Sequence, residues 1–393
     1  MTSQAQTKKL PEGWKKDKLG DVAEIFDNKR IPLSEIERAK INGPYPYCGA
    51  NGIIDHINKF IFDGEYVLLA EDGGDFKRFG NSAYLMNGKF WVNNHAHVLK
   101  AIEGEITNQY LLIILNYLDL NQYVVGSTRK KLNQEQLREI LIPLPPLPEQ
   151  RAIATILSEV DRALENIEKE IQATERLKKG LMAKLLENPN WKKVKFCTIC
   201  NKIQSGGTPL TSNKEFYDGE IPFVKIEDIT NSGKYINKTE IKISEKGLEN
   251  SNAWLIPENN LLLAIYGSLG KVTINKIPLT TNQAILGIIL NNNLANTEFY
   301  YYYFNYLDLQ RYAKKSTQAN LTAEIIKNLD IPLPPLPEQQ RIAEILSTID
   351  KKIELEQKKK EKMERIKKGL MNDLLTGNKR VNVENVLKIG GEK

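Results

Sequence analysis

Hydrophobic residues recur in alternating steps of four and three along two long segments of the chain. A period of about 3.5 residues predicts a helix that packs along one seam, as in a coiled coil. The seam of the first segment consists of Ile153, Leu157, Val160, Leu164, Ile167, Ile171, Leu181 and Leu185. The seam of the second consists of Ile342, Leu346, Ile349, Ile353, Met363, Leu370 and Leu374, with Glu356, Lys360 and Lys367 between them. We therefore predict two long helices, the second with the more polar seam.

Both helices begin in the same text, because Ile142-Pro-Leu-Pro-Pro-Leu-Pro-Glu-Gln150 returns as Ile331–Gln339 at an offset of 331 − 142 = 189. Proline and glutamate suit a first helical turn, and Pro189 and Gly377 are expected to end the helices. Such a proline run is also a ligand for SH3-type domains, but its continuation into a helix explains it better. A helix of roughly 39 residues, about 58 Å long, cannot bury its seam alone. We predict that the two helices pack antiparallel, which would place the two intervening segments at opposite ends of a rod.

Short apolar runs bounded by glycine and asparagine predict strands in the segment before each helix. Residues 64–70 match 259–264, and residues 92–98 match 280–286. The loops between these landmarks differ between the two halves. A duplicated frame with divergent loops is expected when two halves do the same job on different targets.

An amphipathic helix follows the strands in each half, predicted at 108–123 and at 297–312. A basic or polar loop comes next, at 126–132 and at 314–321. A short helix and a strand then lead into each proline run. The order in each half is thus a strand-rich core, a helix, a basic loop and a long helix.

Composition places the chain among soluble proteins, with 41% hydrophobic and 26% charged residues. The N-terminus lacks the apolar region of a signal peptide, and no run approaches the roughly 18 apolar residues of a membrane span. We therefore expect the protein in the cytoplasm. A net charge of +6 is compatible with nucleic-acid binding but does not by itself argue for it.

The sequence shows no catalytic centre, so we expect no enzyme activity in this chain. Cys197-Thr-Ile-Cys200 has the spacing of zinc ligands, but no second Cys/His pair follows it, so we expect a buried strand and no metal. Gly267–Val272 resembles the end of a phosphate-binding loop, but Val272 replaces the Ser or Thr that binds magnesium. We predict a turn between strands there. Glu240-Ile-Lys242 is too common a pattern to indicate a nuclease.

Candidate nucleic-acid contacts lie in loops with basic or short polar side chains, which can grip phosphates or approach base edges. Solvated loops without a partner are the structural alternative. The flexible segment before Lys77 and the mobile polar loop Ser205–Thr208 belong to this group. The candidates are Lys77, Arg78, Arg129, Lys130, Lys131, Ser205, Thr208, Lys225, Lys271, Lys314, Lys315 and Ser316. Asn94-His95 and Asn282-Gln283, matched across the halves, are expected to be structural rather than contacts to DNA.

The repeated motif resembles the specificity subunit of type I restriction-modification systems. The resemblance rests on Ile142–Gln150, followed by Ala154–Ser158 and Lys179–Met182, with the same motifs returning 189 residues later. Tyr47–Ile54 and Ser205–Pro209 are also similar to the openings of two classes of target recognition domain.

The resemblance implies an α+β fold with two similar target recognition domains, separated by two long antiparallel coiled-coil helices in an internal pseudo-two-fold repeat. The implied divisions are recognition domain 1 at 1–141, a central helix at 142–188, recognition domain 2 at 189–330, a C-terminal helix at 331–377 and a tail at 378–393. The residues expected to hold the helix pair or dock partners are Ile153, Leu157, Val160, Leu164, Ile342, Leu346, Ile349 and Ile353.

The resemblance also implies a function. Each recognition domain would read one half of a bipartite, asymmetric site on double-stranded DNA, and the helix pair would fix the spacer and dock two methyltransferase subunits. Those subunits would use S-adenosylmethionine to methylate adenine N6, while restriction subunits would use ATP and Mg²⁺, so no cofactor is expected in this chain. A coiled-coil adaptor that does not bind DNA is the alternative.

Overall fold

The two long helices have the predicted position and length. A computed structural model describes residues 10–126, 130–313 and 321–390. Helix α5 spans Leu147–Leu186 and helix α10 spans Leu336–Leu375, each with 40 residues. Gly377 follows α10 with a φ of 68°, a left-handed conformation that glycine adopts without a steric penalty.

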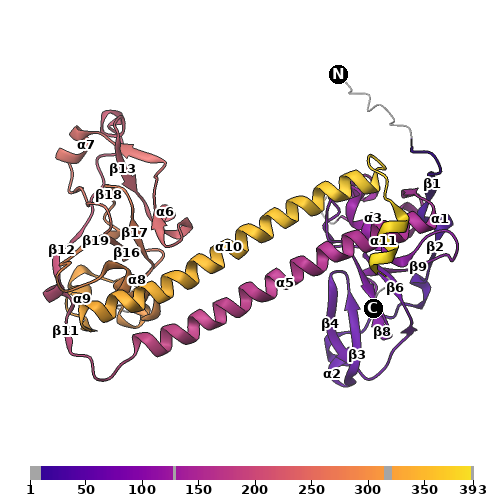
Figure 1. The fold of residues 1–393 in the computed structure, drawn as a ribbon, viewed down its shortest axis with the longest axis horizontal. Helices are drawn as coiled ribbons and strands as arrows, with labels where there is room; N and C mark the ends of the chain where they lie inside the picture. The colour runs from indigo at the N-terminus through magenta and orange to yellow at the C-terminus, as the bar shows by residue number, and fades with distance from the viewer. Residues whose placement is uncertain (1–9, 127–129, 314–320, 391–393) are drawn as a thin grey trace. The chain divides into compact units, whose positions relative to one another are not determined.

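Contacts within the chain divide the structure into two compact units. Unit 1 comprises Met1–Glu168 with Lys358–Lys393, and unit 2 comprises Lys169–Gln357. Each unit therefore contains one strand-rich segment, one half of α5 and one half of α10, elements that Figure 1 labels.

Unit 1 is built on two four-stranded sheets, β2-β9-β6-β7 and β4-β3-β8-β5, and on the antiparallel pair β1-β10. Its strands are β1 Lys15–Lys18, β2 Ala23–Ile25, β3 Asn42–Gly49, β4 Gly52–Ile57, β5 Phe62–Asp63, β6 Tyr66–Ala70, β7 Ala83–Met86, β8 Lys89–Val92, β9 Ala96–Ala101 and β10 Leu141–Leu144. Its shorter helices are α1 Leu19–Val22, α2 Glu35–Ala39, α3 Asn108–Tyr117, α4 Gln134–Arg138 and α11 Val383–Gly390, with 3-10 helices at Asp27–Lys29 and Leu120–Tyr123.

Unit 2 repeats this plan with a five-stranded sheet, β12-β19-β16-β17-β14, a three-stranded sheet, β15-β13-β18, and the pair β11-β20. Its strands are β11 Lys193–Lys195, β12 Cys200–Ser205, β13 Ile221–Val224, β14 Tyr235–Ile236, β15 Ile241–Ile243, β16 Leu261–Ala264, β17 Val272–Asn275, β18 Thr280–Thr281, β19 Ile285–Leu290 and β20 Asp330–Pro332. Its shorter helices are α6 Ile226–Asn231, α7 Glu245–Glu249, α8 Thr297–Tyr306 and α9 Ala323–Lys327, with 3-10 helices at Phe196–Ile199, Lys214–Tyr217 and Leu309–Tyr312.

Strands β6 and β16 are buried on both faces, which explains their uninterrupted apolar sequences. Successive side chains of a strand point to opposite faces. Val67 and Leu69 accordingly join one core cluster, and Leu68 joins another. Strand β16 alternates in the same way, with Leu261 in one cluster and Leu262 in another. Each unit therefore has a core on both sides of its central strand.

The helix halves within each unit run antiparallel, as predicted. In unit 1, Lys367 Nζ lies 2.5 Å from Asp161 Oδ1. In unit 2, Lys178 Nζ lies 2.6 Å from Asp350 Oδ1. The repeat relates Asp161 to Asp350 and Lys178 to Lys367. The two units thus contain the same interhelical ion pair, each made by an aspartate of one repeat and a lysine of the other.

The polar part of the second seam is explained by these pairs. Lys367 occupies a seam position and meets Asp161, and Lys360, another seam position, forms an ion pair with Glu168. The stems of the two lysines can cover apolar surface while their ammonium groups reach the facing helix. A seam with charged residues therefore still specifies register.

The predicted strand at 92–98 is wrong, because a turn interrupts it. β8 ends at Val92 in one sheet, and β9 begins at Ala96 in the other. Asn93 Oδ1 accepts from His95 N–H at 2.8 Å, an Asx turn that redirects the chain. In unit 2, Asn282 Oδ1 accepts from Ala284 N–H at 3.2 Å in the same way. The equivalent residues are therefore Asn93 and Asn282, one position away from the match predicted for Asn94, and their role is structural.

Each predicted amphipathic helix ends earlier than expected. α3 stops at Tyr117 and α8 at Tyr306, and a 3-10 helix follows each of them. Asp119 and Asp308 cap these 3-10 helices by accepting from the backbone N–H two residues later, at 3.1 and 3.2 Å. An aspartate that bonds its own backbone favours a new helix start over continuation.

The cysteine pair does not lie in a buried strand. Cys197 is exposed within the 3-10 helix Phe196–Ile199, and Cys200, the first residue of β12, is half-buried. The Cys200 thiol donates to Phe196 O at 3.2 Å. By contrast, the predicted turn between strands at Gly267–Val272 is confirmed, since it joins β16 to β17.

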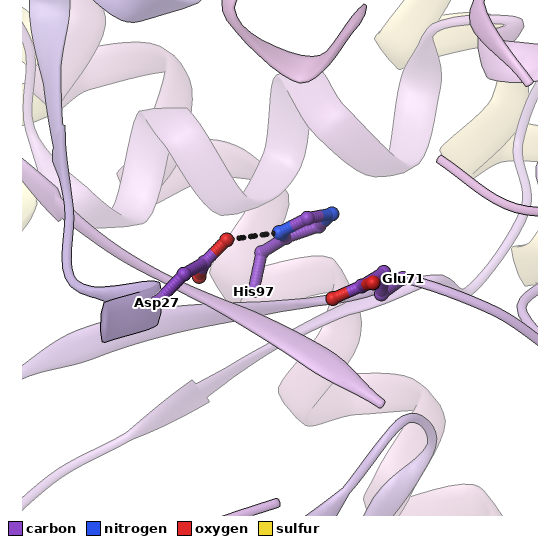
Figure 2. A group of neighbouring side chains, drawn as sticks. All are labelled: Asp27, Glu71 and His97. Atoms are coloured by element: carbon purple, nitrogen blue, oxygen red, sulfur yellow. Dashed lines mark hydrogen bonds and ion pairs between the residues drawn. The ribbon is translucent and has the colours of Figure 1, made fainter. Parts of the chain in front are cut away.

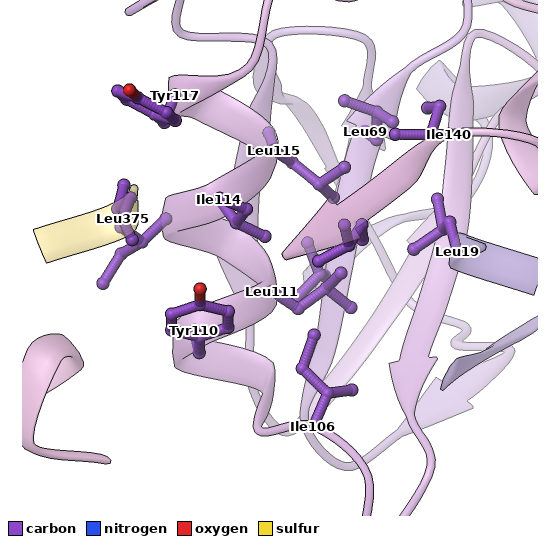
Figure 3. Packing of buried hydrophobic residues seen from close by; sticks show 14 of the residues in the cluster. Leu19, Leu69, Ile106, Tyr110, Leu111, Ile114, Leu115, Tyr117, Ile140 and Leu375 are labelled. Carbon is purple, nitrogen blue, oxygen red and sulfur yellow. The ribbon is translucent and has the colours of Figure 1, made fainter. Parts of the chain in front are cut away.

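The ends of the long helices belong to the domain cores. Leu374 and Leu375 of α10 and Leu157 of α5 lie in the main hydrophobic cluster of unit 1. Figure 3 shows Leu375 against the face of α3 that carries Tyr110 and Ile114. Burial of large apolar side chains at the start and end of each helix joins each helix end to the unit that contains it.

A buried glutamine fastens each proline run to the segment before α3 or α8. Gln150 accepts from Thr107 N–H at 3.1 Å and donates to Glu105 O at 2.9 Å and to Pro145 O at 3.0 Å. Gln339 makes the three corresponding bonds in unit 2. The two halves therefore share their frame down to individual hydrogen bonds.

Candidate nucleic-acid interface

The structure brings the two predicted DNA-contacting loops of unit 1 together. Lys131 of the basic loop forms a β-bridge with Asp72 of the glycine-rich loop. Its ammonium lies 2.7 Å from Glu71 Oε1. The N–H of Leu132 also donates to Glu71 O at 2.8 Å. Residues about sixty positions apart in sequence thus share one surface.

Three lysines of these loops are exposed: Lys77, Lys130 and Lys131. Lys77 follows the glycine-rich loop, and Lys130 lies in the basic loop, where its ammonium donates to Asn121 Oδ1 at 3.2 Å. A bond to a neutral amide does not neutralise Lys130, so its charge is available to a phosphate. Arg129, a predicted contact in the same basic loop, lies outside the described residues.

Arg78 is engaged within the protein. Its guanidinium carbon lies 4.6 Å from the centroid of the Tyr117 ring, and it donates to the Tyr117 hydroxyl. It also donates to Asn372 Oδ1 of α10 at 2.6 Å. Arg78 would have to leave both partners to reach a base.

A cluster of largely buried charged and polar side chains contacts both loops. His97 Nδ1 lies 2.6 Å from Asp27 Oδ2 (Figure 2). Its Nε2 donates to Leu132 O at 2.7 Å. Arg30 donates to Glu71 Oε2 at 2.6 Å. The cluster thus places Arg30 and the His97 ring against two carboxylates, with Lys131 at its edge.

These charges determine the ionisation of the two carboxyl groups. Burial alone would raise the pKa of Asp27, but the His97 hydrogen bond and the charges of His97 and Arg30 outweigh it and lower that pKa. Burial likewise acts to raise the pKa of Glu71, and hydrogen bonds from Lys131 and Arg30 lower it overall. Both groups are anionic in the folded unit.

The cluster does not suit a metal ion. Asp27, Glu71 and His97 bring possible ligand atoms within 4.8 Å of one another. However, Arg30 already faces both carboxylates, and both ring nitrogens of His97 already have hydrogen-bond partners. A metal would have to displace the guanidinium and take a ring nitrogen of His97 from its present partner. The arrangement instead holds the segments that carry the loops.

Unit 2 fills the corresponding space with apolar side chains. Leu321 N–H donates to Ile265 O at 3.3 Å, the bond that Leu132 makes to Glu71 in unit 1. Ile265 therefore stands in place of Glu71, and Leu286 stands in place of His97; both belong to the hydrophobic core. Among the residues that the structure describes, the positions of Glu71 and His97 are therefore charged or polar in unit 1 and apolar in unit 2.

We expect unit 1 to lose stability below about pH 4, near the pKa of a free aspartate. The depressed pKa values of Asp27 and Glu71 contribute stability that is present above their unfolded pKa and is lost as the pH falls through the folded pKa. Hydrogen exchange of β6 and β16 between pH 6 and 3 reports each unit, and protection of β6 should fall more steeply. Asp27→Asn should reduce that difference by up to about 1.4 kcal/mol per pH unit; equal slopes without the substitution would contradict the expectation.

The predicted mobile loop of unit 2 is anchored at its glycines. Gly206 and Gly207 are buried, and their N–H groups donate to Ile285 O at 3.1 Å and Thr281 O at 3.0 Å. A Cβ on Gly206 would lie 1.9 Å from Thr281 O, so only glycine fits this approach. The glycines serve close packing rather than mobility.

Polar side chains at the edges of this anchored loop remain accessible in part. Thr208 is exposed and its hydroxyl donates to Gln283 Oε1 at 2.5 Å. Ser205 ends β12, and its carbonyl accepts from Trp254 Nε1 at 3.2 Å. Thr208 and Gln283 together present an exposed hydroxyl and amide, groups that can pair with base edges.

Lys225 and Lys271 lie on either side of α6. Lys225 caps the helix, and its N–H donates to Asp228 Oδ2 at 2.7 Å. Lys271 donates to Thr230 O at 2.5 Å, and burial lowers its pKa. Lys314, Lys315 and Ser316, the polar loop of this half, lie outside the described residues.

The eight seam residues fall into two groups. Ile153 and Leu157 belong to the core of unit 1, and Ile342 and Leu346 to the core of unit 2. Val160, Leu164, Ile349 and Ile353 are half-buried. The first four join each helix to its own domain and are covered, whereas the second four keep accessible apolar surface.

Sequence reasoning missed the charge cluster of unit 1. Asp27, Arg30, Glu71 and His97 come from three separate segments, and no local spacing connects them. The available signal was Glu71 directly after a buried apolar run, since a carboxylate there requires a partner.

Among the described helices, none combines the length and apolar character needed to cross a bilayer.

Comparison with known proteins gives a consistent assignment. The model of the type I restriction modification DNA specificity domain matches residues 11–176 and 188–365. The putative type I restriction enzyme MjaX specificity subunit of Methanocaldococcus jannaschii is 31% identical, with 95% of each chain covered. The MjaVIII specificity subunit of the same organism is 28% identical over 95% of this chain and 94% of the relative.

Solved structures show the same fold. The S subunit of a type I restriction-modification system from M. genitalium superposes with a TM-score of 0.62 at 18% identity, covering 93% of this chain and 98% of that one. A chain from a structural study of complex assembly in the type I R-M system gives a TM-score of 0.59, covering 95% and 100%. The predicted resemblance is confirmed: the chain belongs to the type I restriction-modification DNA specificity family.

Proposed function

We propose that each half of this chain reads one half of a bipartite, asymmetric DNA site, while the helix pair fixes the spacer between the half-sites. Family membership makes DNA recognition the role of this chain in a type I restriction-modification complex, as a specificity subunit and not a catalytic one. Residues 1–141 and 189–330 are the proposed recognition domains, and 142–188 and 331–377 the helices between and after them. The tail is 378–393.

One observation carries the proposal: the frame is duplicated, and the surfaces near the loops are not. Gln150 and Gln339 make equivalent bonds in the two units. The neighbouring loops differ in kind, since unit 1 supports a lysine-bearing pair of loops with a buried charge cluster and unit 2 uses an apolar core. Equal frames with unequal surfaces suit two different half-sites.

The proposed phosphate contacts are basic side chains at the edges of these loops. They are Lys77, Arg129, Lys130, Lys131, Lys225, Lys271, Lys314 and Lys315. Ser205, Thr208 and Ser316 are the proposed polar contacts. Positive charge supplies affinity that falls with salt, and short polar groups supply base discrimination.

The proposed partners are double-stranded DNA, two methyltransferase subunits and the restriction subunits. Val160, Leu164, Ile349 and Ile353 offer half-buried apolar surface along the helices for subunit docking. S-adenosylmethionine, ATP and Mg²⁺ would be bound by those partners. The assembled complex would methylate adenine at N6 and cleave DNA with ATP.

Replacing Tyr45–Lys100 with the corresponding part of a relative is expected to change one half of the recognised sequence and leave the other half unchanged. The segment runs from within β3 to within β9 of unit 1 and contains no residue of unit 2. Base-resolved methylation by the complex assembled with its methyltransferase subunits is the measurement. The matched control replaces Ile221–Ile289, which should change only the other half.

A change in both halves after either replacement would contradict the assignment of one domain to one half-site. A chain that neither binds duplex DNA nor directs methylation with its partners present would favour the adaptor alternative.

A further inference from the structure

In each unit, a basic side chain outside the long helices contacts α10 and also bonds to the hydroxyl of a tyrosine. In unit 1 the cation is Arg78, in the loop between β6 and β7, and the tyrosine is Tyr117 of α3. In unit 2 the cation is Lys234, just before β14, and the tyrosine is Tyr302 of α8.

The unit 1 contact joins three elements at one point. Arg78 donates to Asn372 Oδ1 at 2.6 Å, and the Tyr117 hydroxyl donates to the same oxygen at 3.1 Å. The guanidinium also lies over the Tyr117 ring, 4.6 Å from its centroid. Ala183 occupies the position of α5 that the repeat relates to Asn372, so this acceptor is specific to α10.

Backbone strain marks the same loop. Phe79 has a φ of +62°, which a bulky side chain rarely adopts. Its N–H donates to Tyr117 O at 3.4 Å, and its ring meets the Tyr117 ring edge-on with centroids 5.5 Å apart. Such a conformation persists only where the surroundings over-determine it. The turn is therefore shaped to present Arg78 to Tyr117.

The unit 2 contact is more extensive. Lys234 Nζ donates to Glu298 at 3.0 Å, to the Tyr302 hydroxyl at 2.9 Å and to Ser347 Oγ of α10 at 3.2 Å. Tyr302 in turn donates to Asp350 Oδ2 at 2.6 Å, and Asp350 holds Lys178 of α5. Ile113 replaces Tyr302 in the other half, where the cation uses a different tyrosine.

A groove lies beside the unit 2 contact and is lined by residues of the strand-rich domain and of α10. The groove has a volume of about 1010 Å³, and its lining includes Lys234, Tyr301 and Tyr306 from the domain side and Ser347 and Gln357 from α10. Domain and helix are therefore separated along this line by open space. Lys234 crosses it with a side chain that is only 10% exposed.

We propose that Arg78 and Lys234 are positioning residues that fix the angle of each recognition domain on the helix pair, and so restrict the spacer that the protein accepts. This inference rests on the proposed reading of two half-sites across a fixed spacer. Each cation meets the helix at the flank, away from the hydrophobic seam. Such a contact controls tilt, whereas the cores described above control folding.

The test measures methylation by the assembled complex on a ladder of DNA duplexes whose spacer differs from the native length by one or two base pairs. Arg78→Met and Asn372→Leu remove the two sides of the unit 1 contact. Lys234→Met and Ser347→Ala remove the two sides of the unit 2 contact. Because Ser347 is half-exposed, Ser347→Ala is the variant that should leave the buried network folded. Each should lower the preference for the native spacer about tenfold, equivalent to about 1.4 kcal/mol. The conservative variants Arg78→Lys and Lys234→Arg should retain most of the preference for the native spacer. The base preference within each half-site should stay the same in all variants.

Three results would overturn the inference. If Arg78→Met changed the base preference of one half-site and Asn372→Leu did not, Arg78 would be a base-reading residue. If all variants kept the wild-type spacer profile, the contacts would not set the angle, although the proposed function would stand. A wild-type complex that accepts every spacer equally would overturn the fixed spacer itself, and the positioning role with it.

Discussion

Replacing Gln150 with leucine is expected to destabilise unit 1 by about 3 kcal/mol or more, at roughly 1–3 kcal/mol for each of the three buried polar groups left without a partner. The side chain is 1% exposed and satisfies Thr107 N–H, Glu105 O and Pro145 O. Leucine has nearly the same size but offers no hydrogen bonds. The proline run would then lose its attachment to the segment that starts α3.

The internal repeat supplies the controls for this expectation. Gln339→Leu should destabilise unit 2 by a similar amount, because its three bonds are equivalent. Gln172→Leu, at an exposed position of α5, should have little effect. Hydrogen exchange resolves the two units, with β6 reporting unit 1 and β16 reporting unit 2. A Gln150→Leu effect no larger than that of Gln172→Leu would show that the bonds do not matter.

Deleting one heptad from each long helix is expected to reduce methylation at the native spacer at least about tenfold and to favour a spacer about three base pairs shorter. Seven residues correspond to about 10 Å of helix, and three base pairs to about 10 Å of DNA. Forcing DNA to fit a changed separation costs on the order of 1–6 kcal/mol. The deletions are residues 164–170 of α5 and 358–364 of α10.

The choice of residues preserves the register of the pair. Both deletions lie between the ion pairs Asp161–Lys367 and Lys178–Asp350, so both pairs can still form. Deleting the α5 heptad alone leaves one helix longer than the other between the same two pairs and should prevent their simultaneous formation. Methylation of spacer ladders by the assembled complex distinguishes the cases. An unchanged spacer preference in the double deletion would refute the proposal that the helix pair fixes the spacer.

The long helices illustrate what a periodic sequence predicts well. Their period extends over about five heptads, and proline and glycine mark their ends, so Leu147–Leu186 and Leu336–Leu375 agree with expectation closely. The strand expected at 92–98 illustrates the opposite. Its apolar residues belong to two strands in different sheets, and the Asx turn at Asn93 separates them. A few residues carry too little periodicity to reveal such a change of sheet.

The candidate contacts divide in a similar way. Basic residues in loops are visible in sequence, and Lys77 and Lys130 are indeed exposed. Their relation is not visible, since Lys131 meets Glu71 across a long stretch of chain. Arg78 looks in sequence like a base-reading arginine, and only the fold shows that it faces Tyr117 and Asn372.

The sequence by itself determined the duplication, the two long helices and the family, because each depends on repeated local text or on a period sustained over many residues. Only the tertiary structure decided which loops share a surface, that unit 1 supports its loops with buried charges while unit 2 uses apolar side chains, and which cations are already engaged. These properties depend on contacts between residues far apart in the chain. Such contacts follow from packing and charge compensation in three dimensions, which no local pattern encodes.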